Sequence, residues 1–85
     1  MDQPRRHGET QQLILKKRSV TLAGHRTSVT LEPAFWAALE AIAKQRGASL
    51  QKMIEDIDIA RGDTNLSSAL RVYVLDSVIK HNNNA

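Results

Sequence analysis

The chain has 85 residues, no cysteine and a formal net charge of +3. This length allows one small domain, and the absence of cysteine excludes a disulfide framework and a thiolate zinc site. No apolar run approaches the length of a membrane span or a signal-peptide hydrophobic region, so we expect a cytoplasmic protein.

The positive charge is concentrated near the start of the chain. Residues 1–31 carry six Lys or Arg and two Asp or Glu, whereas residues 32–85 carry six and seven. Residues 1–12 are polar, lack periodicity and contain Pro and Gly, which is typical of a flexible segment. The predicted organisation is a flexible basic arm (1–17), a folded domain (18–81) and a polar tail (82–85). This asymmetry of charge favours an anionic partner.

Two short segments near the start have the same sequence. Ser19–Leu22 and Ser28–Leu31 both read Ser-Val-Thr-Leu, with Ala23-Gly24-His25 between the longer segments that contain them. Their alternation and β-branched residues predict strands. Two arrangements remain open: the pair forms a hairpin through Gly24, or one strand pairs with the same strand of a second molecule. We favour the second, with Arg26–Leu31 as that strand, because it runs directly into a helix and a lone strand needs a partner.

Three helices are expected after the strands. They are predicted at 33–46, from about 50 to Gly62, and at 66–80. Pro33 suits a first helical position, Gly47 a helix end, and Ser49 an N-cap. The third helix is apolar nearly all round, which argues for a dimer or larger assembly because a chain of this size cannot easily bury every side of it. The expected fold is therefore mainly α, with one N-terminal strand paired across a homodimer and two to three helices after it.

Alternate residues of a strand share a face. One face of the favoured strand holds Thr27, Val29 and Leu31, which are expected to point to the core, and the other holds Arg26, Ser28 and Thr30. An arginine can bind guanine as a bidentate donor, and hydroxyls can bind base edges or phosphates. These three residues are therefore candidates for base contacts in DNA; the alternative is the solvated face of an ordinary amphipathic strand.

Basic residues before this strand offer further contacts. Arg5 and Arg6 could enter an adjacent minor groove, and Lys16, Lys17 and Arg18 could meet phosphates. The alternative is a tail without affinity for DNA.

The order of strand, helix, Gly-containing turn and Ser-capped helix resembles the ribbon-helix-helix (MetJ/Arc-type) DNA-binding proteins. The resemblance rests on Arg26–Leu31 as the ribbon, 32–46 as the first helix and 47–50 as the turn. It implies base contacts from Arg26, Ser28 and Thr30, and phosphate contacts from Ser49 and Leu50 at the start of the second helix. If helix 50–60 is an insertion, the phosphate contacts move to Ser67 and Ser68. The expected dimer core is Val29, Leu31, Trp36, Leu70, Tyr73 and Val74.

The function that we expect is a bacterial, dimeric DNA-binding protein that represses transcription. Its expected partners are double-stranded DNA and further copies of itself, as a dimer or a tetramer, and no membrane. One alternative is an antitoxin whose C-terminal helix binds a toxin. Another is an adaptor that uses the acidic residues Glu55, Asp56 and Asp58 as a partner surface. No catalytic group, cofactor or metal site is expected, since no nucleophile–base pair is present and the three histidines lack ligand spacing.

Overall fold

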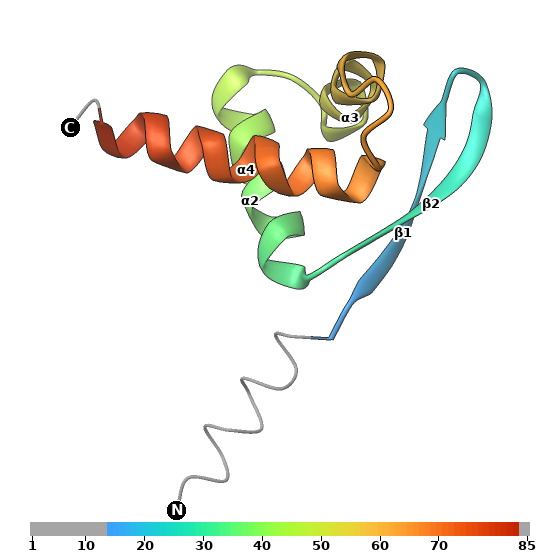
Figure 1. Cartoon of the computed structure of the whole chain (residues 1–85), viewed down its shortest axis with the longest axis horizontal. Helices are drawn as coiled ribbons and strands as arrows, with labels where there is room; N and C mark the ends of the chain where they lie inside the picture. Colours follow the sequence, from blue (N-terminus) through green and yellow to red (C-terminus); the bar gives the residue numbers. More distant parts are fainter. Residues whose placement is uncertain (1–13, 84–85) are drawn as a thin grey trace, which may run out of the picture.

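The structure, a computed structural model, describes residues 14–83 and consists of a β-hairpin followed by three helices (Figure 1). The elements are β1 (Lys16–Leu22), β2 (His25–Leu31), α2 (Pro33–Arg46), α3 (Leu50–Ala60) and α4 (Leu66–Asn83). This confirms a mainly α fold in which strands near the N-terminus precede three helices. Strand β1 begins two residues before the predicted start of the domain. Arg5 and Arg6 lie outside the described residues.

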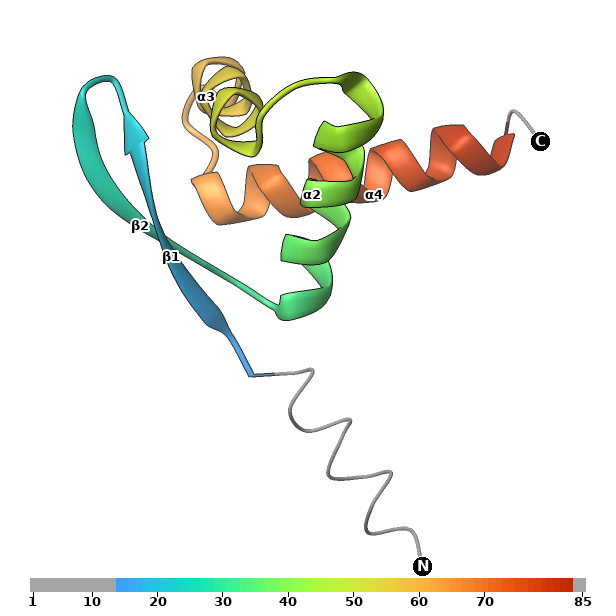
Figure 2. The ribbon, with the colours of Figure 1, turned by 180° about the vertical axis from the view of Figure 1, so that it is seen from behind.

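The hairpin lies at the N-terminal end of α4, and α4 crosses α2 (Figures 1 and 2). Viewed from behind, α2 is in front of α4, so α4 covers one side of α2 only (Figure 2). None of the helices in residues 14–83 has the length and apolarity needed to cross a bilayer.

The two Ser-Val-Thr-Leu copies pair with each other in an antiparallel hairpin, which is the arrangement that we did not favour. The loop is Ala23-Gly24, and both residues have positive φ angles, 52° and 81°. A two-residue loop with positive φ at both positions is a type I′ turn, whose twist matches that of the strands it joins. The turn pairs Leu22 with His25, and this register brings Ser19 opposite Ser28.

Replacing Gly24 by alanine is expected to destabilise the protein. A Cβ atom at this position meets no atom within 4 Å, so the cost is purely that of holding an L-residue at a φ of 81°. We expect a loss of about 1 kcal/mol or somewhat more in the free energy of unfolding, measured by urea denaturation. Ala23→Asn is the matched control, because asparagine tolerates positive φ and should leave stability unchanged or raise it. Equal losses in both variants would contradict this account of the turn.

The helix boundaries follow local signals. Pro33 opens α2, and Gly47 ends it with a φ of 69° while its N–H donates to the Lys44 carbonyl at 3.1 Å. The Ser49 hydroxyl caps α3 by accepting from the Lys52 N–H at 3.0 Å. The Asn65 side chain accepts from the Ser68 N–H at 3.1 Å and so caps α4. These are the groups that satisfy the free N–H and C=O groups at helix ends.

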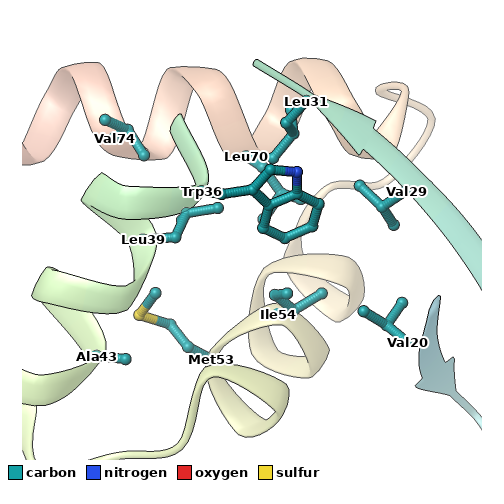
Figure 3. Packing of buried hydrophobic residues seen from close by; sticks show 10 residues of the cluster. All are labelled: Val20, Val29, Leu31, Trp36, Leu39, Ala43, Met53, Ile54, Leu70 and Val74. Atoms are coloured by element: carbon teal, nitrogen blue, oxygen red, sulfur yellow. The ribbon is translucent and has the colours of Figure 1, made fainter. Parts of the chain in front are cut away.

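The core lies between the inner side of the hairpin and the three helices (Figure 3). Trp36 on α2 is at its centre, 2 % exposed, and its indole N–H donates to the Lys16 carbonyl of β1 at 2.9 Å. Its neighbours come from every element and include Val20, Val29, Leu31, Leu39, Ala43, Met53, Ile54, Leu70 and Val74. The residues expected in a dimer core thus lie in the core of a single chain, where all but the half-buried Tyr73 are fully buried.

One local expectation needs correction. Thr27 lies on the inner side of the hairpin but is exposed, whereas its partner Val20 on β1 is buried. The buried stripe of α2 runs through Trp36, Leu39 and Ala43, and Phe35 and Ile42 are only half-buried. Glu40 pairs with Arg18 of β1 at 2.8 Å and not with Lys44 one turn further along the helix.

An ion pair connects α4 to the junction between β2 and α2. The Arg71 guanidinium donates to both carboxylate oxygens of Glu32, at 3.0 and 3.3 Å. These hydrogen bonds hold the pKa of Glu32 below its usual value of 4.5. Next to this pair, the Ser67 hydroxyl donates to the Thr30 carbonyl at 3.2 Å. The start of α4 is therefore attached to the end of β2 by two contacts.

Stability is expected to fall in acid partly through Glu32. Because its pKa is lower in the folded than in the unfolded chain, the ion pair contributes stability above pH 4.5, and this contribution is lost as the pH falls through the folded-state pKa. The measurement is the melting temperature from pH 7 to pH 3 for the wild type and for Glu32→Gln. The difference between the two proteins should narrow as the pH falls below 4.5. A difference independent of pH would show that the charge of Glu32 is unimportant.

Candidate nucleic-acid interface

One side of the hairpin is polar along its whole length. The register pairs Lys17 with Thr30, Ser19 with Ser28, and Thr21 with Arg26. Directly opposite residues of an antiparallel pair point to the same side, so all six side chains share the side that faces away from the helices. We call this side the outer face. Five of the six residues are exposed, and Thr30 is half-buried.

The inner face of the hairpin contacts the helices through apolar side chains and through one arginine. Val20, Val29 and Leu31 are buried against the helices. Arg18 also lies on this side, where its guanidinium stacks over the Trp36 ring at 4.7 Å and pairs with Glu40. Arg18 therefore holds β1 against α2. Lys16, Lys17 and Arg18, all predicted to bind phosphate, line one open hollow of about 380 Å³ beside the start of α2.

Strand β2 has one edge that no strand covers in residues 14–83. Hydrogen bonding alternates along an antiparallel ladder, and the two-residue loop makes Leu22 and His25 a bonded pair. The backbone groups of Arg26, Ser28 and Thr30 consequently point away from β1. The partner of Arg26 on β1 supports this alternation, since the Thr21 carbonyl accepts from the Gln51 side chain of α3 and not from β2.

The two helix starts considered for phosphate contacts lie at opposite edges of the hairpin. Gln51, in the first turn of α3, bonds to the Thr21 backbone at the edge of β1. Ser67, in the first turn of α4, bonds to Thr30 at the edge of β2. Each helix therefore begins next to a strand. Ser49 and Leu50 lie by β1, and Ser67 and Ser68 lie by β2.

The acidic residues of α3 lie away from the outer face. Glu55 and Asp58 line a hollow with the hairpin turn. Asp58 pairs with Arg61 at 2.6 Å, Asp56 pairs with Lys52 at 3.2 Å, and Glu55 accepts from Gln51 at 2.8 Å. Asp56 and Asp58 are therefore each paired with a cation, whereas Glu55 keeps its negative charge because the Gln51 amide is neutral.

The structure brings Arg26, Ser28 and Thr30 together on the outer face, as the alternation of the strand predicts. It adds Ser19 and Thr21, which the sequence reasoning did not consider, and it places Lys17 beside them. The sequence feature that could have identified these residues is the repeat of Ser-Val-Thr-Leu on both sides of a glycine-containing loop. If a two-residue turn is assumed at Ala23-Gly24, the two copies align and Ser19 is predicted to lie opposite Ser28.

No cluster of three or more His, Cys, Asp or Glu side chains suited to hold a metal ion occurs in the described part of the chain. The hairpin thus offers a polar, partly cationic surface of hydrogen-bond donors and acceptors. Such a surface can bind the base edges and phosphates of DNA.

Comparison with known proteins shows which family this architecture belongs to. The chain matches a solved structure, that of an uncharacterized protein from Bordetella pertussis Tohama I, with a TM-score of 0.77 and 34 % sequence identity. The match covers 88 % of this chain and 64 % of the other, so this chain spans somewhat less than two thirds of the length of that relative. No curated protein matches the chain. The model of the ribbon-helix-helix domain family matches residues 15–78, from the start of the hairpin into α4. The chain therefore belongs to the ribbon-helix-helix domain family.

Proposed function

We propose that this protein is a homodimeric repressor of transcription that binds a specific DNA sequence through the outer face of its hairpin. Membership of the ribbon-helix-helix family indicates a DNA-binding regulator, and a regulatory protein of this kind is typically not an enzyme. The observation that carries the proposal is the separation of the hairpin into a buried inner side and a wholly polar outer face containing Lys17 and Arg26.

The proposed dimer forms through the edge of β2 that no strand covers in residues 14–83, where the Thr30 carbonyl also accepts from the Ser67 hydroxyl. The outward backbone groups of Arg26, Ser28 and Thr30 are centred on Ser28, so two copies related by a two-fold axis would pair Ser28 with the same residue of the second copy. The result is a four-stranded sheet with the two β2 strands in the middle. This keeps the predicted ribbon, with Arg26, Ser28 and Thr30 from each copy, and adds one flanking β1 strand on either side.

The width of this sheet assigns different roles to its strands. Neighbouring strands lie about 4.8 Å apart, so four strands span about 14 Å between the outermost axes. The major groove is about 12 Å wide, so only the two central strands fit inside it. The β1 strands then lie over the walls of the groove, where phosphates are. This supports base contacts from Arg26, Ser28 and Thr30, and phosphate contacts from Lys17 and Lys16.

Arg18 and the helix starts have supporting roles in this proposal. Because the Arg18 guanidinium stacks on Trp36 and pairs with Glu40, only the part of it that remains exposed to solvent could also bind a phosphate. The N–H groups at the start of a helix favour anions. With β2 paired in the centre of the sheet, the start of α3 lies on the β1 side and faces the groove wall, which favours Ser49 and Leu50 over Ser67 and Ser68. The arm residues Arg5 and Arg6 would add contacts in a minor groove.

The decisive experiment is a fluorescence titration of the protein with the DNA upstream of its own gene, together with a scrambled duplex of equal length, at several salt concentrations. We expect specific binding whose log K falls against log salt with a slope of roughly −5 to −7, if each copy neutralises three or four phosphates. Equal affinity for both duplexes, or none at low salt, would exclude the proposal.

The β2-edge dimer has a separate test. The chain has no cysteine, so Ser28→Cys introduces a single thiol. Directly opposite hydrogen-bonded residues have Cα atoms about 5.5 Å apart, within the range that a disulfide spans. Mild oxidation should therefore give a covalent dimer, whereas Ala34→Cys, at an exposed position of α2, should stay monomeric on a denaturing gel. Failure of Ser28→Cys to cross-link would refute this dimer but not DNA binding.

The antitoxin function is a second candidate, favoured by the exposed apolar side of α4, which could bind a toxin. It predicts that a toxin encoded by a neighbouring gene co-purifies with the wild-type protein and not with a variant carrying a charge on that side of α4. A neighbouring gene that is harmless when expressed alone would count against it.

A further inference from the structure

An open groove lies between α3 and α4, with the end of α2 beside it, and none of the residues that line it belongs to the hairpin. Its volume is about 590 Å³. The buried Met53 and the half-buried Ile57, Ala69 and Tyr73 give it an apolar interior. Volumes of about 300–1,000 Å³ and a mainly apolar lining with a few polar groups are typical of sites that bind small organic molecules.

Two alanines leave room for a ligand between the helices. Ala60 at the end of α3 and Ala69 near the start of α4 both line the groove. Since an alanine side chain ends at its Cβ atom, neither position fills the space between the two helices. An apolar chain can occupy that space and cover the interior of the groove.

The charges around the groove are balanced at three of its four charged residues. Each of these three forms an ion pair with a residue on the same helix or at its end. The pairs are Asp56–Lys52 at 3.2 Å, Asp76–Lys80 at 3.0 Å and Arg61–Asp58 at 2.6 Å. None of these pairs carries a net charge, so the fourth charged residue decides the sign of a preferred ligand.

That fourth residue is Arg46, the last residue of α2. Within residues 14–83 it forms no ion pair. Its guanidinium donates to the neutral Tyr73 hydroxyl and lies 5.6 Å from the centre of the Tyr73 ring. A hydroxyl that accepts from an arginine can still donate its own hydrogen, so both residues can donate to one anion at the groove. A guanidinium suits a carboxylate in particular, because it can donate two parallel hydrogen bonds to it.

We propose that the groove between α3 and α4 binds a medium-chain carboxylic acid, a small organic anion with an apolar chain. The Arg46 guanidinium and the Tyr73 hydroxyl hold the carboxylate, and the chain lies against Met53, Ile57 and Ala69. This site does not rest on the proposed function, because it contains no residue of the hairpin.

The first test compares three ligands with the same number of carbon atoms, namely octanoate, octanol and octylammonium. Each is titrated into the wild-type protein at neutral pH without DNA, by isothermal titration calorimetry. We expect octanoate to bind at least about tenfold more tightly than octanol, because hydrogen bonds to a charged group are stronger than those between neutral groups. Octylammonium should bind most weakly, because Arg46 repels it.

Two results of this comparison would overturn the proposal. One is no binding of octanoate below the concentration at which it forms micelles. The other is an affinity for octanol or octylammonium that equals or exceeds the affinity for octanoate, since apolar contacts or the aspartates would then determine binding.

The second test replaces the cation of the groove. Arg46→Gln should weaken octanoate binding about tenfold and leave octanol binding unchanged. The matched control is Lys44→Gln, which removes an exposed cation from the same last turn of α2 but outside the groove, and it should change neither affinity. Circular dichroism checks that both variants are folded. An equal loss for octanoate and octanol would mean that Arg46 only supports the shape of the groove, and it would overturn the proposal, as would an unchanged octanoate affinity.

The third test locates the ligand. Ala60 is exposed at the edge of the groove, so Ala60→Phe should fill the groove without disturbing the core and should weaken both octanoate and octanol binding at least about tenfold. The control is Ile59→Phe, at the neighbouring exposed residue outside the groove, which should leave both affinities unchanged. Unchanged octanoate binding in Ala60→Phe would overturn the proposal.

The failure of this inference can be distinguished from the failure of the proposed function. A protein that binds its upstream DNA but not octanoate refutes the groove site alone, and a protein that binds octanoate but no DNA refutes the proposed function alone. An octanoate affinity that falls as the protein concentration rises would assign the groove to a second copy of the chain and would also overturn this inference.

Discussion

Trp36→Ala is expected to cost about 3–5 kcal/mol of unfolding free energy, the range typical of a buried aromatic residue replaced by alanine. Three kinds of contact are lost together: the packing of the buried ring, the hydrogen bond from its N–H to the Lys16 carbonyl, and the stacking of Arg18. Because small domains have a total stability of about 5–15 kcal/mol, this loss is a large fraction of it. Urea denaturation followed by circular dichroism measures the change.

Trp36→Phe is the matched control for this variant. It keeps most of the ring volume and the cation–aromatic contact but loses the hydrogen bond to β1, so its loss should be clearly smaller. If alanine and phenylalanine cost the same, the packing of the ring is not what holds the hairpin against α2. If neither variant is destabilised, the central position of Trp36 in the core is wrong.

Arg26→Ala is expected to have the largest effect on DNA binding. Loss of a bidentate contact to guanine costs about 1–3 kcal/mol, and a dimer carries two copies of the contact. Arg26 is exposed on the outer face and supports no part of the core, so the melting temperature should be unchanged. The variant should lose affinity for the specific duplex more than for a scrambled one, which a competition titration measures.

Two control variants make the result for Arg26 interpretable. Lys17→Ala should weaken binding to both duplexes alike and make the salt dependence less steep, as expected of a phosphate contact. Lys80→Ala removes an exposed lysine near the C-terminal end of α4 and should change neither the affinity for the two duplexes nor the salt dependence. If Arg26→Ala weakens binding to both duplexes alike, as expected for Lys17→Ala, then Arg26 contacts phosphates and not bases.

The helices could be predicted from the sequence because their signals are local. Pro33, Gly47 and Ser49 mark helix ends within a few residues of the groups that they satisfy, and the structure has helices at the predicted places. The face of β2 that holds Arg26 was equally predictable, since alternation along a strand depends on that strand alone.

The features that sequence reasoning missed depend on contacts between distant segments. Arg18 pairs with Glu40 across 22 residues of sequence, and nothing near either residue signals this pair. The burial of Leu70 and Val74 within one chain depends on how α4 crosses α2, so the apolar character of α4 alone could not show which of its sides remains open. The pairing of the two strands was the exception, because the type I′ turn that sets it is a local signal in Ala23-Gly24.

The separation between the two sides of the hairpin has a consequence for the evolution of the protein. None of the six outer-face side chains belongs to the core, and the fully buried residues of the hairpin all lie on the inner side. Substitutions at these six positions should therefore change what the hairpin binds at little cost in stability. Relatives could diverge in binding preference while keeping one scaffold. A library randomised at these positions alone should contain many folded members with new preferences.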